Sequence, residues 1–359
     1  MHNGKGRLGL ATLACVGLAI AISTPAAAWD RGSVQNFLVT SGFPMVEGLT
    51  VDKQGNVYTP TFNPTGSPPA QLFTFDSSGN VINRVNIQNS SSAMLGLAFR
   101  PGTDALLVLD FGAHQVLSVD PTSGKSVICI TLPSGSQAGA GLNALTFDPN
   151  GNVYISDSFQ GIIWRFSPKE SGAACGQATA WVTDPLLLPN NGKQPESVPP
   201  FGANGVEFNN EGTAMFVCNT AIDSIVKIPL TGALGKGGKP GTPVVFTNSI
   251  NGCDGIAIDS NDNIWAAANQ ADEMVVVDPT GKVIGKLGDF NGVQSGQTQG
   301  LLFPASPAFS PDGHFLWVTN LELDLRTLNI SQAVDSGWAA EVTQHSIARI
   351  PVPTTFPAF

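Results

Sequence analysis

The sequence predicts an all-β protein, a six-bladed β-propeller of four-stranded blades, on three observations. Glycine (40 residues) and proline (26 residues) interrupt the 359-residue chain along its whole length. Six tight turns of the kind that joins β-hairpins recur along it, each between two short apolar runs. The turns follow one another at roughly 50-residue spacing, which is typical of propeller blades.

Each repeated unit supplies the strands of one blade. The six turns are DKQGN (52–56), RPGTDA (100–105), DPNGN (148–152), NNEGT (209–213), DSNDN (259–263) and SPDGH (310–314). A third apolar run follows each hairpin, and usually a fourth. Because one small sheet cannot cover both of its apolar faces, the blades are expected to pack around a common axis. The segment 33–40 precedes the first unit, and we expect it to close the ring as the outer strand of the last blade.

The first 28 residues predict a secretory signal peptide. Lys5 and Arg7 precede an apolar stretch from Leu8 to Ile22, and small residues follow up to Ala28. The apolar stretch is too short to favour a membrane anchor. We therefore expect an exported protein, periplasmic or secreted, with no membrane span and with a single propeller domain over residues 29–359.

Charge and cysteine content narrow the function classes. The formal net charge of −10 argues against binding to nucleic acid or to an anionic membrane surface. Beyond the signal peptide lie four cysteines: Cys129, Cys175, Cys218 and Cys253. An even number in an oxidising compartment predicts disulfides, and three pairings are open. The chain has no CxxC pair and its four histidines do not cluster, which argues against a zinc or haem site built on sulfur and imidazole.

Three segments depart from the repeat and are interpreted as insertions or long loops: 59–70, 184–202 and 321–343. The first two are rich in proline, which is unsuited to interior strands. The third contains SQAVDSGWAAEVTQ, which is compatible with a short helix. We expect all three segments to surround one mouth of the central channel and to determine the range of substrates.

A polar residue recurs just before the inner strand of four units. In chain order this position holds Glu47, Leu95, Asn143, Asn204, Asp254 and Ala305. Inner strands of a propeller surround its channel, so these side chains should face one another at one mouth. Two carboxylates and two amides without sulfur or imidazole suit a hard cation, Ca²⁺ first, with Mg²⁺, Mn²⁺ or Zn²⁺ as alternatives. The competing interpretation is that these residues only cap turns.

The end of the second strand gives a further ring at the same mouth. It comprises Thr61, Asp110, Asp157, Asn219, Asn269 and Asn320. Within it, Asp110, Asp157, Asn219 and Asn269 are candidates for substrate binding, with loop capping as the alternative. His114, in the loop DFGAHQV, is a candidate proton shuttle near neutral pH.

With these residues placed, the chain resembles the SMP-30/gluconolactonase/LRE-like family and, more distantly, the paraoxonases and strictosidine synthase-like proteins. The resemblance is found in VEGLTVD with Glu47, GANGVEF with Asn204 and GCDGIAIDSNDNIWAAA with Asp254, which look like the family's three metal-binding stretches. Asn143 lies where the family has an asparagine that touches metal or substrate. The resemblance implies a metal-dependent hydrolase, commonly a lactonase, in which Asp254 is a ligand and the general base or nucleophile.

The chain also departs from the family. Sugar lactonases carry an arginine two positions before the residue that corresponds to Asn143, where this chain has Gly141, and NDG where it has NAL. This difference argues against a sugar lactone. A moderately hydrophobic lactone or ester is the small-molecule substrate that we expect.

Three functions from different classes follow from these observations. The first is an exported Ca²⁺-dependent hydrolase in which Asp254, or a water that it deprotonates, attacks a carbonyl carbon. The second is a strictosidine synthase-like condensing enzyme, which would need a glutamate near the last blade, where Glu322 and Asp324 are the only acidic candidates. The third is a non-catalytic binding propeller with a structural ion.

Overall fold

The computed structural model describes residues 31–41, 45–133, 140–167, 175–189, 200–232, 238–328 and 335–354, together with Met1, Leu234 and Phe356. The expected signal peptide, apart from Met1, lies outside these residues. Within the described part of the chain, no helix has the length and apolar character needed to cross a membrane.

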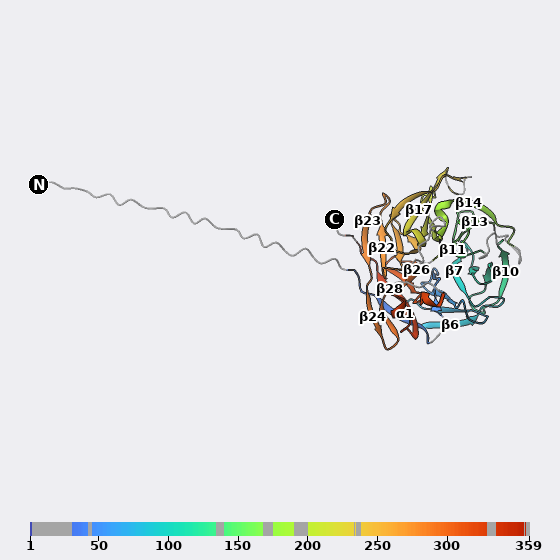
Figure 1. The fold of residues 1–359 in the computed structure, drawn as a ribbon, viewed down its shortest axis with the longest axis horizontal. Helices are drawn as coiled ribbons and strands as arrows, with labels where there is room; N and C mark the ends of the chain where they lie inside the picture. The colour runs from blue at the N-terminus through green and yellow to red at the C-terminus, as the bar shows by residue number, and fades with distance from the viewer. Residues whose placement is uncertain are drawn as a thin grey trace. The chain divides into compact units, whose positions relative to one another are not determined.

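The strands form six small sheets that follow one another in chain order around a ring within the unit Arg31–Phe359 (Figure 1). The predicted six-bladed propeller is therefore confirmed. Blade 1 comprises β2 (Met45–Val46), β3 (Thr50–Val51), β4 (Val57–Phe62), β5 (Gln71–Phe75) and β6 (Val81–Asn86). Blade 2 comprises β7 (Met94–Phe99), β8 (Leu106–Asp110), β9 (Gln115–Val119) and β10 (Ser126–Thr131). Blade 3 comprises β11 (Leu142–Phe147), β12 (Val153–Asp157), β13 (Ile162–Phe166) and β14 (Thr179–Thr183).

The last three blades keep this four-stranded plan, and two of them have additions. Blade 4 comprises β15 (Ala203–Phe208), β16 (Ala214–Asn219), β17 (Ser224–Thr231) and β19 (Val244–Asn248), with the short β18 (Lys239–Pro240) also paired to β17. Blade 5 comprises β20 (Cys253–Ile258), β21 (Ile264–Ala268), β22 (Glu273–Val277) and β23 (Val283–Leu287). Blade 6 comprises β26 (Pro304–Phe309), β27 (Phe315–Asn320), β28 (Gln344–Pro351) and β1 (Gln35–Ser41), with the hairpin of β24 (Phe290–Gln294) and β25 (Gln297–Gly300) added.

The N-terminal strand closes the ring, as the sequence predicts. β1 pairs antiparallel with β28, from Gln35 opposite Arg349 to Ser41 opposite Gln344. The Arg349 guanidinium carbon lies 5.1 Å from the centre of the Phe37 ring on β1 and 5.1 Å from that of Trp317 on β27. Arg349 also donates a hydrogen bond of 2.7 Å to the Ser77 carbonyl oxygen of blade 1. The first strand, the last blade and the first blade are thereby joined.

A β-bulge near the start of the inner strands corrects one expectation. In β7, β11, β15, β20 and β26 the pairing register shifts between the first and fourth residues. Asn143, Asn204 and Asp254 therefore lie inside their strands, at the bulge, rather than before them. Glu47 directly follows β2, where the inner strand of blade 1 is interrupted. A bulge releases a residue from the regular ladder and turns its side chain, which here aims these oxygens at the channel mouth.

Small residues after the bulged position allow neighbouring inner strands to touch. A Cβ atom on Gly205 would lie 2.4 Å from the Asp254 carbonyl oxygen, and one on Gly255 would lie 2.4 Å from that of Ala305. A Cβ atom on Gly48 would lie 2.1 Å from the Leu95 carbonyl oxygen. Since real Cβ atoms are never this close to backbone oxygens, glycine is required here on steric grounds. The narrow ring holds the preceding side chains at fixed positions.

Two disulfides connect neighbouring blades and settle the pairing that the sequence left open. Cys129 on β10 pairs with Cys175, close to β14, with Cα atoms 4.9 Å apart. Cys218 on β16 pairs with Cys253 on β20, with Cα atoms 5.2 Å apart. The second disulfide thus joins blade 4 to the residue immediately before Asp254.

The insertions contain short helical turns. They are η1 (Pro185–Leu187), η4 (Leu325–Leu328) and α1 (Ser336–Ala339). α1 lies in the stretch for which the sequence predicts a short helix. The serine that begins α1 accepts a 3.1 Å hydrogen bond from the Leu325 amide through its hydroxyl, so the helix is attached to the segment that follows β27.

Replacement of Phe37 by alanine is expected to lower the free energy of unfolding by about 2 kcal/mol. Full burial of a phenylalanine would predict a loss of about 3–5 kcal/mol, and Phe37 is half-buried against Trp317, with ring centres 5.2 Å apart. Urea denaturation measures the change. Leu38→Ala on the same strand is the control, since Leu38 is 44% exposed and its loss should cost less than about 0.5 kcal/mol. Equal losses in the two variants would show that the closing strand does not act through this contact.

Candidate functional site

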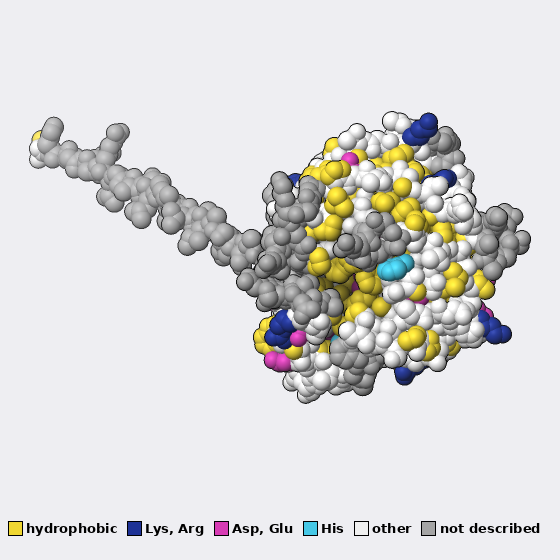
Figure 2. All heavy atoms as spheres, turned by 45° about the vertical axis from the view of Figure 1, so that its right-hand side comes forward, with side chains coloured by type: hydrophobic (Ala, Val, Ile, Leu, Met, Phe, Trp, Pro, Cys, Tyr) yellow, Lys and Arg dark blue, Asp and Glu magenta, His cyan; other side chains and the backbone are white. Residues whose placement is uncertain are grey.

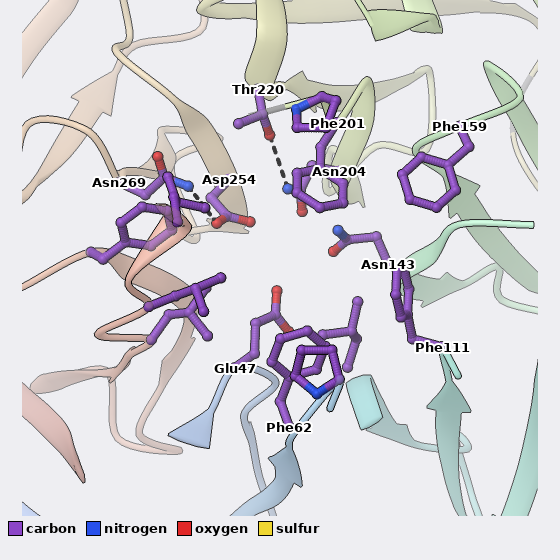
Figure 3. Close-up of a pocket in the computed structure, with 17 residues that line it drawn as sticks. Glu47, Phe62, Phe111, Asn143, Phe159, Phe201, Asn204, Thr220, Asp254 and Asn269 are labelled. Carbon is purple, nitrogen blue, oxygen red and sulfur yellow. Dashed lines mark hydrogen bonds between the residues drawn. The ribbon is translucent and has the colours of Figure 1, made fainter. Parts of the chain in front are cut away.

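A cavity of about 270 Å³ lies at one mouth of the channel, and the four predicted oxygen donors all line it. Glu47, Asn143, Asn204 and Asp254 come from four different blades, and their side chains point toward a common space (Figure 3). All four are at least nine-tenths buried. The structure therefore brings together the residues that share one frame in the sequence.

Three oxygen atoms of this group have no hydrogen-bond partner within the described part of the chain. They are Glu47 Oε2, Asn204 Oδ1 and Asp254 Oδ1, and each is shielded from solvent. An unpaired buried polar atom typically costs about 1–3 kcal/mol, so three of them in one cavity need an explanation. A hard cation between them would satisfy all three at once, and carboxylate and amide oxygens are ligands that Ca²⁺ accepts.

The two carboxyl groups are electrostatically unfavourable without a positive charge. Burial raises the pKa of Glu47 well above its usual range, and the Asp254 carboxylate raises it further. Burial raises the pKa of Asp254 to about 7, against the lowering effect of the Asn269 and Asn204 amide groups. In the absence of a cation, protons would neutralise this pair near neutral pH.

The donor set differs from the usual clusters of ionisable metal ligands. Within the described ranges, no three His, Cys, Asp or Glu side chains lie close enough together to hold a metal ion. A metal ion in this cavity would therefore depend on amide oxygens as well as on the two carboxylates.

Two side chains orient these candidate ligands. Asn269 donates a 2.7 Å hydrogen bond to Asp254 Oδ2 and accepts one of 3.1 Å from Gln270 Nε2. Thr220 accepts a 2.9 Å hydrogen bond from Asn204 Nδ2. In both cases one end of the candidate ligand is held and the other end is free to face the cavity. Thr220 was not anticipated from the sequence.

Apolar side chains form the walls, and all three irregular segments contribute to them, as expected. The segments provide Phe62 and Pro64, Pro200 and Phe201, and Leu321, Leu323 and Leu325. Within the described lining of the cavity there is no lysine, arginine or histidine. Figure 2 shows apolar side chains gathered in the middle of the face in view, with Lys and Arg side chains toward its edge.

Four phenylalanines make a continuous aromatic arc along one side of the cavity. The ring centres of Phe62 and Phe111 are 6.1 Å apart, those of Phe111 and Phe159 are 5.8 Å apart, and those of Phe159 and Phe201 are 5.6 Å apart. Sequence reasoning missed Phe111 and Phe159, and also Phe303 in the wall. The sequence held a signal for the first two. Phe111 directly follows the second-ring residue Asp110, and Phe159 lies two residues after the second-ring residue Asp157.

The structure brings only Asn269 of the four second-ring candidates to the cavity. The Asp110 carboxylate accepts hydrogen bonds from the Ser91 amide at 2.8 Å and from the Ala113 amide at 3.0 Å. The Asp157 carboxylate accepts from the Gly141 amide at 2.9 Å. These carboxylates cap loops, and this corrects the expectation that they face a substrate.

Asn219 and His114 also point to neighbouring loops. The Asn219 amide donates hydrogen bonds of 2.8 Å and 3.0 Å to the Leu186 and Leu188 carbonyl oxygens, and so holds the insertion around η1. His114 Nδ1 lies 2.7 Å from the Ala140 carbonyl oxygen, and His114 does not line the cavity. The expected proton shuttle at His114 receives no support from this placement.

The acidic residues that a condensing enzyme would need are not in the cavity either. Glu322 is buried between the two wall residues Leu321 and Leu323, but its carboxylate accepts hydrogen bonds from Thr298 and Ser346 and lies 2.8 Å from His345 Nδ1. Asp324 forms an ion pair with Arg326. Neither Glu322 nor Asp324 lines the cavity, so the structure does not favour the strictosidine synthase-like alternative.

Comparison with known proteins confirms the resemblance and the fold. Residues 199–288, which contain Asn204 and Asp254, match the model of the SMP-30/gluconolactonase/LRE-like region. No curated protein matches the chain.

Many solved structures share the fold, at low sequence identity. A calcium-binding regucalcin from Agrobacterium tumefaciens is 19% identical, with a TM-score of 0.56 over 90% of this chain and 96% of that one. A luciferin-regenerating enzyme is 13% identical, with a TM-score of 0.61 over 91% and 98%. A gluconolactonase from Xanthomonas campestris is 12% identical, with a TM-score of 0.57 over 92% and 99%. These similarities establish the propeller architecture.

The stability of the protein in the presence of a chelator is expected to fall as the pH rises from about 5 to about 8. Because the pKa of Asp254 is about 7 when folded and near 3.8 when unfolded, the folded state binds the extra proton between these values. The stabilisation is complete below the lower value and is lost as the pH rises through the upper one. Melting temperatures measured across this range test the prediction.

Asp254→Asn is the control for this titration. The variant cannot take up the proton, so its melting temperature should depend less steeply on pH. Asp272, whose pKa burial also raises to about 7, contributes equally to both proteins. Glu47 contributes differently, because the Asp254 carboxylate that helps to raise its pKa is absent from the variant. Identical slopes for the two proteins would show that Asp254 does not titrate in this range.

Proposed function

We propose that this protein is a divalent-cation-dependent hydrolase, with Ca²⁺ as the first candidate, that opens a moderately hydrophobic lactone or a related ester. The observation that supports this most strongly is the set of three unpaired, buried oxygen atoms in a cavity whose walls are largely apolar. The match of residues 199–288 to the SMP-30/gluconolactonase/LRE-like region supports a lactonase-type propeller.

Glu47, Asn204 and Asp254 would hold the cation, with Asn143 as a fourth ligand either directly or through water. Their formal charge of −2 matches a divalent ion, and Mg²⁺, Mn²⁺ or Zn²⁺ are the alternatives to Ca²⁺. When bound, the cation supplies a Lewis acid that stabilises negative charge on a substrate carbonyl oxygen.

Asp254 is the general base in this proposal. Its Oδ2 atom is fixed by the Asn269 amide, so the carboxylate cannot rotate freely, while Oδ1 faces the cavity. The Asp254 carboxylate would take a proton from the attacking water as the new bond to the carbonyl carbon forms. The proton then passes to the leaving alkoxide, so that one water is consumed and a hydroxy acid, or an acid and an alcohol, is released.

The walls select the rest of the substrate. The aromatic arc and the leucines at 321, 323 and 325 offer contact area but few hydrogen-bond donors. A polyhydroxylated sugar lactone would lose hydrogen bonds to water without replacement, whereas an alkyl or aryl substituent would be buried favourably. The cavity therefore suits an uncharged, moderately hydrophobic ligand.

We also propose that the protein functions outside the cytoplasm. The signal-peptide pattern of residues 1–28 and the two disulfides support this location, because disulfides persist in oxidising compartments.

Asp254→Asn should separate chemistry from cation binding. The variant keeps the size and an oxygen ligand but loses the basic group, so turnover should fall by about 10²–10⁴-fold and stay low at saturating Ca²⁺. Steady-state hydrolysis of a panel of lactones and aryl esters, measured with chelator and with added Ca²⁺, provides the readout.

Glu47→Gln is the matched control, because it removes the same charge from the other carboxylate. If Glu47 acts only as a ligand, saturating Ca²⁺ should restore more of its activity than of the Asp254 variant. Full and equal rescue of both variants would refute the general-base role. Bound Ca²⁺ without turnover on the whole panel would instead indicate a non-catalytic binding protein.

Phe159→Ala should change substrate preference rather than catalysis in general. Loss of the ring removes apolar contact at the centre of the aromatic arc, so kcat/KM for a lactone with a long alkyl or aryl substituent should fall by about tenfold or more. An unsubstituted lactone, which has no substituent to bury against the arc, serves as the internal control. An equal loss for both substrates would contradict this use of the arc.

A further inference from the structure

The candidate ligand Asn204 presents its oxygen, rather than its NH₂ group, to the cavity. The two ends of a side-chain amide have almost the same size, so packing alone does not choose between them. The choice is made by hydrogen-bonding neighbours. The one behind Asn204 is Thr220, which is 1% exposed and begins the short helix η3 (Thr220–Ile222).

The Thr220 hydroxyl has only one proton, and that proton is already used. Thr220 Oγ1 donates a 2.9 Å hydrogen bond to the Cys253 carbonyl oxygen, which can only accept. Toward Asn204 the hydroxyl must therefore accept, and Asn204 Nδ2 donates to it at 2.9 Å. With the NH₂ group held there, Oδ1 faces the cavity, where it is buried and unpaired among the described residues.

We propose that Thr220 is the positioning residue of Asn204: through the Cys253 carbonyl it sets the amide of Asn204 so that an oxygen faces the cation. The proposal rests on the hydrolase function proposed above and adds to it a residue that does not itself touch the cation. Because Cys253 immediately precedes Asp254, the same hydroxyl joins a ligand of blade 4 to the backbone that positions a ligand of blade 5.

The Cys218–Cys253 disulfide holds both ends of this connection. Cys218 lies two residues before Thr220, and Cys253 provides the carbonyl oxygen that Thr220 binds. Both cysteines are fully buried. The disulfide thus limits relative movement of β16 and β20, and keeps the carbonyl within hydrogen-bond distance of the hydroxyl.

Blade 3 provides a natural control for this arrangement. Ser158 occupies the position that corresponds to Thr220, directly after the second-ring residue, and its hydroxyl donates a 2.6 Å hydrogen bond to the Ala203 carbonyl oxygen of the next blade. Within the described contacts, no hydrogen bond joins Ser158 to Asn143. Ser158 therefore links two neighbouring blades, as Thr220 does, but it does not orient the amide of a candidate ligand.

Calcium titration calorimetry of the complete protein tests the proposal. Thr220→Val keeps the shape but removes the hydroxyl, so the Asn204 amide is free to turn and the Kd for Ca²⁺ should rise by about 10–100-fold, as for other residues that support metal ligands. Thr220→Ser, which restores the hydroxyl, should bind like the wild type, as should Ser158→Ala. If the valine variant does not fold, Thr220→Ala takes its place, because it also removes the hydroxyl and leaves a smaller side chain.

The two disulfides give a second matched pair. Cys218→Ala with Cys253→Ala should weaken Ca²⁺ binding, whereas Cys129→Ala with Cys175→Ala should lower only the melting temperature measured in chelator. Wild-type affinity in Thr220→Val, beside weakened affinity in Asn204→Ala, would overturn the role of Thr220 and leave the proposed function intact. Wild-type affinity in Asn204→Ala itself would overturn the ligand assignment, and the positioning role with it.

Discussion

The close approach of the six inner strands around the channel is the constraint on which the rest of the structure depends. Backbone meets backbone at this ring, where a single Cβ atom on Gly205 or Gly255 would lie 2.4 Å from a neighbouring carbonyl oxygen. The bulges that accompany it turn the preceding side chains out of their ladders and toward one mouth. Contacts between backbones therefore fix where the main chain of Asn204 and Asp254 lies, and the side chains of Thr220 and Asn269 then orient their polar groups.

This geometry places two carboxylates in an apolar environment, and that has opposing consequences. Burial raises the pKa of both Glu47 and Asp254, so the site is unfavourable until a positive charge enters it. The same exclusion of water strengthens any interaction between the carboxylates and a cation, and between a cation and a polarised carbonyl group. The apolar walls that would select the substrate and the oxygen atoms that would hold a cation thus depend on each other.

Residues in one sequence frame have different roles because their neighbours differ. Asp110 ends the second strand of its blade, and Asn269 directly follows the second strand of its own. Asp110 is next to the free amides of Ser91 and Ala113 and caps them, whereas Asn269 is next to the Asp254 carboxylate and orients it. Local sequence places both side chains at the same mouth, and contacts with the adjacent loop or strand decide which of them can contribute to the cavity.

The sequence by itself determined the number of blades, the closing strand and the frame that holds Glu47, Asn143, Asn204 and Asp254, because these follow from a repeat of local patterns. It also indicated the segments around the mouth. Tertiary structure alone decided the pairing of Cys218 with Cys253, the arc formed by Phe111 and Phe159, and the link from Thr220 to the Cys253 carbonyl. Each of these joins residues of different blades, and such contacts depend on how the blades pack across the ring, which the strand and turn patterns within one blade do not determine.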